Sequence, residues 1–273
     1  MILTYSLVGL ALFCAVHLFA DRLRFLDGTP RSRWLSAAGG ISLAYVFLHF
    51  MPELAEGQSL VREGEGGVVA LPFIEFELYG LALAGLLAYY GAERYMQTER
   101  GAGRVDSAHT QSEARHLAKD DHEHGSFWVH LGSFSIYNLL TGYLLVRRGE
   151  VEHGSGEGEE ISILFQDAQV SLVTFAVALA IHFLVTDYGL REDFREGYMR
   201  IGRWVLCAAV IGGWGLGATI ALPEIAVLAL IALLGGGMIL NVLKEELPAE
   251  RQSRFAALLG GALGYAVLLA FTH

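Results

Sequence analysis

The segment IAVLALIALLGGGMILNVL (225–243) decides the class of this protein, because it contains no charged side chain. A helix that crosses the hydrocarbon core of a bilayer needs about 20 predominantly apolar residues. Seven further segments have the same character, and the charged residues crowd between them. The whole chain is 53% apolar and only 18% charged, whereas a soluble domain carries about 25% charged residues. We therefore predict an all-α polytopic membrane protein whose first partner is the lipid bilayer.

The expected transmembrane helices form a single domain over 1–273. The third has an apolar core at 78–92, and it reaches back to 70 only if Glu75 and Glu77 face protein or water. A longer loop, 93–125, separates the third helix from the fourth. The eight expected helices cover about 1–20, 34–51, 70–92, 126–146, 168–186, 204–223, 225–243 and 255–272.

The basic residues predict the orientation. Sixteen of the 19 Lys and Arg residues fall in loops 21–33, 93–125, 187–203 and 244–254. By the positive-inside rule these loops are cytoplasmic and both termini lie outside, which for a bacterial protein means the inner membrane. The outer segments then hold 3 basic and 13 acidic residues, and so carry the whole net charge of −10. Such a face attracts cations, although the same sorting rule also leaves acids outside by default. The net charge of −10 excludes nucleic acid as a partner.

Two short segments match when read in opposite directions across the membrane. The second span ends GGISLAYVFLHFMPELAE (39–56), and the seventh ends GGGMILNVLKEELPAE (235–250). Aligning Gly40 with Gly236 brings Pro52 onto Pro248 and His49 onto Glu245. This pattern predicts an inverted repeat, which in many transporters places the substrate near the midplane. The alternative is that glycine-rich helices ending in proline are a common packing device.

Polar side chains at membrane depth usually face a bundle interior or a water path. In the fourth span, Asn138 lies at the edge of a polar face, and in the fifth span His182 lies on one. These two stripes predict a path between consecutive helices, with Asn138 and His182 close together. The alternative is packing between helices through side-chain hydrogen bonds. The intramembrane candidates are His17, His49, His130, Asn138, His182 and Asn241.

The segment 187–203 mixes apolar residues at helical spacing with Arg and Glu. Leu190, Phe194 and Ile201, together with Tyr198, carry that apolar spacing. This pattern predicts a short helix lying on the inner membrane surface.

The layout resembles that of the ZIP (Zrt/Irt-like) metal transporters. The likeness rests on eight spans with both termini outside, a long inner loop with histidines, the motif His49-x-x-Pro52-Glu53, and a seventh span ending EELP (245–248). It covers nearly the whole chain in layout. It implies a ZIP-like bundle, a divalent metal ion as substrate (Zn²⁺ or Fe²⁺ first), no catalytic residues, no organic cofactor and a homodimer.

The metal-binding motifs of that family are only partly present. The family's His-Asn-x-Pro-Asp-Gly aligns with YNLLTG (137–142), and its His-Glu-x-Pro-His/Glu-Glu aligns with HFLVTD (182–187). The resemblance implies Asn138 and His182 as metal ligands. Weaker candidates are Asp187, Thr141, Thr186, His130 and Tyr137.

A count of these ligands predicts weak metal binding. Zn²⁺ takes three or four N, O or S ligands, and Asn138 and His182 supply two. Asp187 lies five residues after His182, about 140° round the helix, so one straight helix cannot aim both at one ion. Removing carboxylates also removes the charge that offsets dehydration of a dication.

Other candidates lie near the membrane surfaces. In the inner loop, the tract DDHEH (120–124) contains His122 and His124, which could hold a metal loosely or belong to a solvated linker. Residues with an entrance or gate role are His49, Glu53, Glu75, Glu77 and Glu245.

Three functions remain open from the sequence. The first is a ZIP-like transporter that moves a divalent cation toward the cytoplasm. The second is a ZIP-shaped protein that has lost metal transport and acts as a sensor, a partner or a carrier of another solute. The third is a haem protein with two of His17, His130 and His182 as axial ligands.

Overall fold

The computed structural model describes residues 2–22, 32–62, 77–106, 112–151, 168–246 and 254–272, and within these ranges it is helical and contains no strand. Six described helices are long and apolar enough to cross a membrane, and Phe255–Ala270 is a shorter apolar one. The predicted all-α class is confirmed. The α-helices are α1 (Ile2–Phe19), α2 (Arg33–Tyr45), α3 (Met51–Arg62), α4 (Glu77–Asp106), α5 (Ser112–Val151), α6 (Ala168–Asp193), α7 (Arg195–Gly197), α8 (Arg203–Thr219), α9 (Glu224–Glu246) and α10 (Phe255–Thr272).

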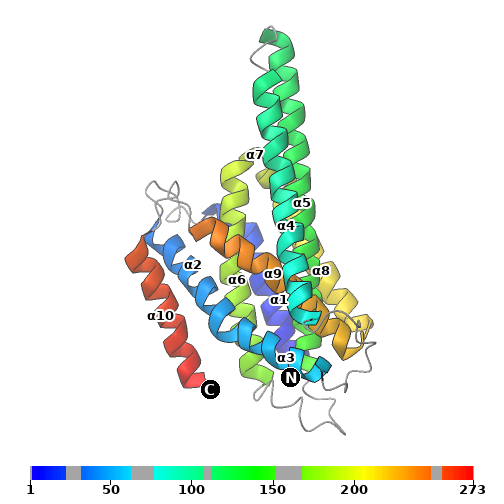
Figure 1. Cartoon of the computed structure of the whole chain (residues 1–273), viewed down its shortest axis with the longest axis vertical. Helices are drawn as coiled ribbons and strands as arrows, with labels where there is room; N and C mark the ends of the chain where they lie inside the picture. The colour runs from blue at the N-terminus through cyan, green and yellow to red at the C-terminus, as the bar shows by residue number, and fades with distance from the viewer. Residues whose placement is uncertain are drawn as a thin grey trace.

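The helices form a bundle with its two ends clearly different (Figure 1). The most extensive packing joins α5 to α8, α4 to α9, α2 to α10, and α1 to α6. The ends of α4 and α5 project beyond the rest of the bundle, and the N- and C-terminal marks lie toward the opposite end. Both termini are therefore on the same side of the bundle.

The outer surface of the bundle is apolar, as contact with lipid requires. On α10, large apolar side chains recur at helical spacing and are exposed: Phe255 by 73%, Leu259 by 42%, Leu263 by 56% and Val267 by 54%. Water would make such a stripe costly, because burial of apolar surface is worth roughly 25 cal/mol per Å². This face of α10 suits a hydrocarbon environment.

The second expected span is longer than predicted and contains a π-helical turn. α2 continues through η3 (Val46–Phe50) into α3, so the helix passes Pro52 and ends at Arg62. Proline has no backbone N–H and its ring crowds the preceding turn. The wider turn accommodates it, with Met51 N–H donating to the carbonyl of Val46.

Glycines bring α2 and α10 into backbone contact. Gly40 on α2 faces the carbonyl of Leu258, and Gly261 on α10 faces the carbonyl of Ala37. A Cβ at either glycine would overlap that carbonyl oxygen. The two helices therefore approach each other closely, as small residues at helix contacts allow.

The same arrangement joins α9 to α4. Gly236 on α9 faces the carbonyl of Ala82, and Gly85 on α4 faces the carbonyl of Leu233. In each of the four helices, the glycine lies three positions after the residue of the same helix whose carbonyl faces the partner helix's glycine. The contact of α9 with α4 thus has the same pattern as the contact of α2 with α10.

The segment 93–125 differs from the expected loop. α4 runs to Asp106 and α5 begins at Ser112, so the segment is helical apart from 107–111, which lie outside the described residues. Its composition accounts for this, because Glu, Arg, Ala and Lys favour helices even without an apolar face. The start of the third expected span, 70–76, also lies outside the described residues.

The segment 187–203 does not form a separate surface helix. α6 continues to Asp193, and only Phe194 leaves the helical conformation before α7, η5 (Tyr198–Gly202) and α8 follow. Leu190 and Tyr198 are buried with Phe127, Leu131 and Leu206 in a core of their own. The apolar spacing of Leu190, Phe194 and Tyr198 reflects packing against α5 and α8, whereas Ile201 is exposed.

Candidate polar site in the bundle

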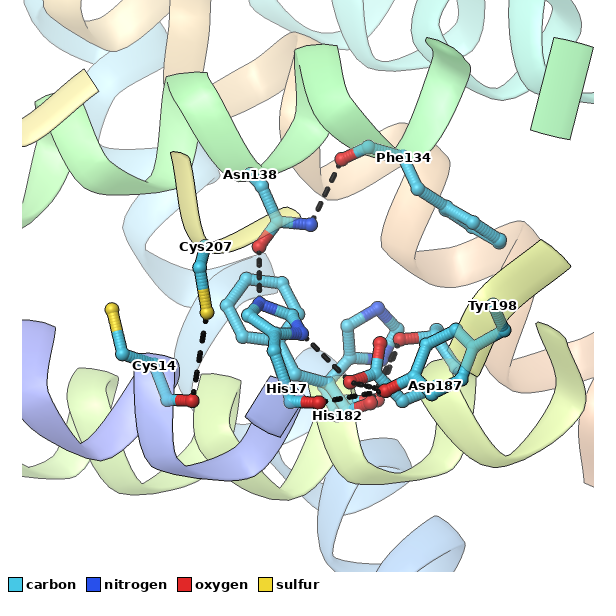
Figure 2. Close-up of polar contacts among 10 residues, drawn as sticks. Cys14, His17, Phe134, Asn138, His182, Asp187, Tyr198 and Cys207 are labelled. Atoms are coloured by element: carbon cyan, nitrogen blue, oxygen red, sulfur yellow. Dashed lines mark hydrogen bonds and ion pairs between the residues drawn. The ribbon is translucent and has the colours of Figure 1, made fainter. Parts of the chain in front are cut away.

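A buried histidine forms the centre of the best-defined polar cluster (Figure 2). His17, near the end of α1, is 1% exposed. Its Nδ1 lies 2.7 Å from Oδ2 of Asp187 on α6, and its Nε2 lies 2.7 Å from Oδ1 of Asn138 on α5. We call His17, Asp187, Asn138 and Tyr198 the His17 cluster.

The surrounding hydrogen bonds fix the roles of these atoms. Asn138 Nδ2 donates to the carbonyl of Phe134 at 2.8 Å, so its Oδ1 faces His17 as an acceptor. His17 Nε2 therefore carries a proton, and a second proton lies between Nδ1 and Asp187. The pair is an imidazolium and a carboxylate, or the neutral pair with the same proton count. In either form one proton lies between His17 and Asp187.

Tyr198 completes the cluster from the π-helical turn η5. Its hydroxyl is within hydrogen-bond distance of Asp187 Oδ2, at 2.9 Å, and of the carbonyl of His17, at 3.0 Å. Arg191 also donates to the carbonyl of Ala20 at 3.1 Å, which ties α6 to η1 (Ala20–Arg22), the short helical turn directly after α1. The cluster thus joins α1, α5, α6 and η5 at one buried point.

Substitution of Tyr198 by Phe tests the contribution of its hydroxyl. We expect Tyr198→Phe to lower the free energy of unfolding by about 1–3 kcal/mol, because a buried charged acceptor loses a donor. Tyr90→Phe, on an exposed side chain of α4, is the matched control and should change little. Thermal unfolding in detergent measures both, and equal midpoints for the two variants would contradict this role.

His182 lies beside the His17 cluster (Figure 2) but makes no side-chain hydrogen bond to it. It is 2% exposed, and its Nε2 has no hydrogen-bond partner. Asn138 is hydrogen-bonded to His17 and Phe134. Asn138 and His182, the two metal ligands that the resemblance implies, are therefore not hydrogen-bonded to each other. Asp187 likewise pairs with His17, in keeping with the large angle between positions 182 and 187 on one helix.

Aromatic rings fill the space beside both histidines. The Phe183 ring lies 5.1 Å from the His17 ring and 6.3 Å from the His182 ring, between centroids. Tyr137 lies 5.6 Å from His182 and 5.9 Å from Phe183. Phe183 stands at the position of a carboxylate in the ZIP motif, so an apolar ring occupies this part of the bundle.

The weaker metal candidates make other contacts. Thr141 Oγ1 donates to the carbonyl of Tyr137, and Thr186 Oγ1 lies near the carbonyls of His182 and Phe183. His130 is buried with its ring 5.3 Å from that of Phe194. Within the described ranges, no three His, Cys, Asp or Glu side chains gather where they could hold a metal ion.

The entrance candidates are only partly described. His49 stacks on Tyr45 with centroids 5.3 Å apart, and Glu53 is buried. Glu77 accepts a hydrogen bond from Gln58 at 2.9 Å, while Gln58 also accepts one from the N–H of Leu78 and so caps α4.

Four candidates cannot be placed in this way. Glu75 lies outside the described residues, as do the side chains of Glu245, His122 and His124.

The sequence singled out His17 as an intramembrane residue but did not assign it to the site, and it placed Tyr198 on a membrane surface. The feature of the sequence that could have indicated a site role for His17 is its expected depth in the membrane, which is similar to that of His182. α1 carries no polar stripe to show which helices His17 faces. The two cysteines, Cys14 and Cys207, are free, and Cys207 Sγ lies 3.6 Å from the carbonyl of Cys14.

The fold and the buried cluster together define an all-helical protein of membrane-spanning character. A comparison with models of known protein families finds no match, and a comparison with curated proteins finds none either.

Proposed function

We propose that this chain is a ZIP-like membrane transporter that moves a divalent cation, zinc or iron first, toward the cytoplasm. The chain lies in the inner membrane of a bacterium, with both termini on the outer side. The His17 cluster lies in the transport path, in place of a strong metal site. Eight spans are arranged as an inverted repeat. The protein works by positioning and exchange, not as an enzyme.

The buried pair of His17 and Asp187 is the observation that carries this proposal. Their side chains are 0% and 3% exposed, and Nδ1 and Oδ2 are 2.7 Å apart. Ionisable groups inside a membrane bundle are costly and typically mark ion pathways or proton relays. Asn138 and Asp187 also stand at positions that resemble the metal-binding motifs of the ZIP family.

The matching glycine contacts support the inverted repeat. Exchange of α2 with α9 and of α10 with α4 turns one glycine-mediated contact into the other. The spacing of three residues is not specific to these two contacts, because Gly142 of α5 and Gly213 of α8 have it as well. Gly40 and Gly236, which the sequence alignment pairs, are equivalent in these contacts. A repeat of this kind gives a transporter two similar halves that can move against each other around a central site.

The chemistry of the cluster suits exchange of a cation for a proton. Release of the shared proton leaves a neutral imidazole and the Asp187 carboxylate. A cation that reaches this point then meets Asp187 Oδ2, Asn138 Oδ1 and an imidazole nitrogen, all ligand types that divalent metals use. The single negative charge offsets only part of the ion's dehydration, so binding is transient.

A second function is favoured by the completeness of the same network. Within the described part of the chain, each member of the His17 cluster bonds to another member or to backbone. Such a network can serve as a fixed clamp between helices in a ZIP-shaped protein that no longer moves metal. His17 does not support the haem alternative, because both of its ring nitrogens are engaged; His130 and His182, the other pair that the alternative allows, are not tested by this.

Metal uptake into proteoliposomes tests the proposal. We expect purified full-length protein to transport Zn²⁺ or Fe²⁺ faster than protein-free vesicles, and Asp187→Asn to reduce uptake to the protein-free level. Glu192→Gln, at an exposed position of the same helix, should retain uptake. Uptake that is unaffected by Asp187→Asn would place the path elsewhere. Failure of the wild-type protein to move any of several divalent ions would favour the clamp.

A further inference from the structure

The two cysteines of the chain meet inside the bundle, between α1 and α8. Cys14 and Cys207 are 193 positions apart in the sequence, and the Cys207 thiol donates to the carbonyl oxygen of Cys14 at 3.6 Å. The two thiols are also within hydrogen-bonding reach of each other. Figure 2 shows Cys14 on α1 and Cys207 on α8 with both sulfur atoms between the two helices. Neighbouring free thiols of this kind are the reactants of a disulfide.

A second contact holds the two helices in register. Trp214 Nε1 donates to Ser6 Oγ at 3.2 Å, about two helical turns from the cysteines on each helix. The contacts run forward along α1, from Ser6 to Cys14, and backward along α8, from Trp214 to Cys207, so the two helices are antiparallel. The thiols therefore lie opposite each other in a packed contact and not at a loose helix end.

The two thiols differ in exposure, which predicts the order in which they react. Cys14 is partly exposed, whereas Cys207 is buried, with 6% of its surface exposed. Hydrogen peroxide is small and uncharged, so it reaches a thiol within a membrane without the dehydration cost of an ion. Oxidation of cysteine by peroxide depends on the accessibility of the thiol. Cys14 is therefore the thiol that reacts first, and Cys207 is the resolving thiol beside it.

We infer that Cys14 and Cys207 are a redox-active pair that hydrogen peroxide converts to a disulfide. In the first step the Cys14 sulfur attacks one peroxide oxygen, the O–O bond breaks, and the released hydroxide takes the thiol proton as water, which leaves a sulfenic acid. In the second step the Cys207 sulfur attacks the Cys14 sulfur. The S–S bond forms, the S–O bond breaks, and hydroxide leaves with the Cys207 proton as a second water. Two thiols and one peroxide thus give one disulfide and two waters, and a dithiol reductant restores the thiols.

This bond ties α1 to α8 next to the His17 cluster. His17 follows Cys14 by about one turn of α1, and Tyr198 lies in η5, which continues into α8. Oxidation therefore fixes the spacing of two elements that supply the cluster. The inference goes beyond transport, because it rests only on the two thiols and on the contact between their helices.

Mass spectrometry of the full-length protein in nanodiscs tests the pair. The reduced protein is treated with hydrogen peroxide, the remaining thiols are blocked with N-ethylmaleimide, and the chain is digested without reductant. We expect a disulfide-linked peptide that contains Cys14 and Cys207 and that dithiothreitol separates. In Cys207→Ser, we expect Cys14 to stop at a sulfenic acid, which dimedone traps.

A control variant moves one thiol to another face of the same helix. In Cys207→Ser/Ala208→Cys the thiol moves about 100° round α8, to a position that is exposed. We expect at least about tenfold less linked peptide than in the wild-type protein, because thiols that point apart cannot be bridged.

Three results would overturn the inference. The first is that both wild-type thiols stay free under peroxide that oxidises the cysteine introduced at position 208. The second is a sulfenic acid on Cys14 in the wild-type protein without any linked peptide. The third is equal linkage in the wild-type protein and in the control variant. If the variants do not fold, the wild-type peptides alone decide the question, because linkage of Cys14 to Cys207 within one chain is required.

Discussion

Asp187→Leu is expected to lower the free energy of unfolding by about 3–5 kcal/mol, the range observed when one partner of a buried ion pair is removed. The substitution leaves the buried His17 ring facing an apolar side chain and removes an acceptor of Tyr198. Asp193→Leu, at an exposed position of the same helix, should change stability far less. Chemical unfolding in detergent micelles measures both variants.

The double variant separates an ion pair from two independent contacts. In His17→Leu/Asp187→Leu neither charge remains, while Asn138 keeps its bond to Phe134 and Tyr198 keeps the His17 carbonyl. We therefore expect the double variant to be more stable than Asp187→Leu alone. If the two single effects simply add, His17 and Asp187 do not stabilise the fold as a pair, which would contradict the role given to their direct contact.

Gly213→Ala is expected to destabilise the bundle by about 1–3 kcal/mol or more, the cost of overpacking a close contact. A Cβ at Gly213 of α8 would overlap the carbonyl oxygen of Leu139 on α5, and backbone cannot rotate away. At the neighbouring Gly212 a Cβ meets nothing within 4 Å. Gly212→Ala should therefore stabilise the helix by up to about 1 kcal/mol, and thermal unfolding should show opposite shifts.

Another pair of adjacent glycines repeats this experiment on α10. A Cβ at Gly261 would overlap the carbonyl of Ala37, whereas Gly260 has open space. The proposed inverted repeat further predicts that Gly85→Ala on α4 costs about as much as Gly261→Ala, because that repeat would place the two positions in corresponding contacts. A large cost at one and none at the other would contradict that equivalence.

Hydropathy was sufficient to predict most helices, because lipid permits few alternatives to a long apolar helix. Hydropathy did not predict how far the helices continue beyond their apolar segments. The helix through Pro52 continues because a π-helical turn accommodates the ring, and the described parts of 93–125, up to 106 and from 112, are helical although they carry few apolar residues. Neither effect leaves a hydropathy signal.

The site was harder to predict than the helices. Periodicity places Asn138 and His182 on polar faces, but it cannot say which neighbouring helix each face meets. That depends on close approaches such as Gly142 of α5 against the backbone of Val210 on α8. His17 pairs with Asn138 and Asp187 because α1 packs against both α5 and α6. The sequence of α1 does not show which helices it packs against.

In the proposed mechanism, a cation crosses the membrane in exchange for the proton of the His17 cluster. Proteoliposomes with a pH-sensitive dye inside and a zinc-sensitive dye in the same vesicles measure both movements at once. We predict that zinc entry is accompanied by proton release from the vesicles, and that His17→Gln abolishes the proton movement. Zinc entry without proton movement in the wild-type protein, or full proton movement in His17→Gln, would contradict the account.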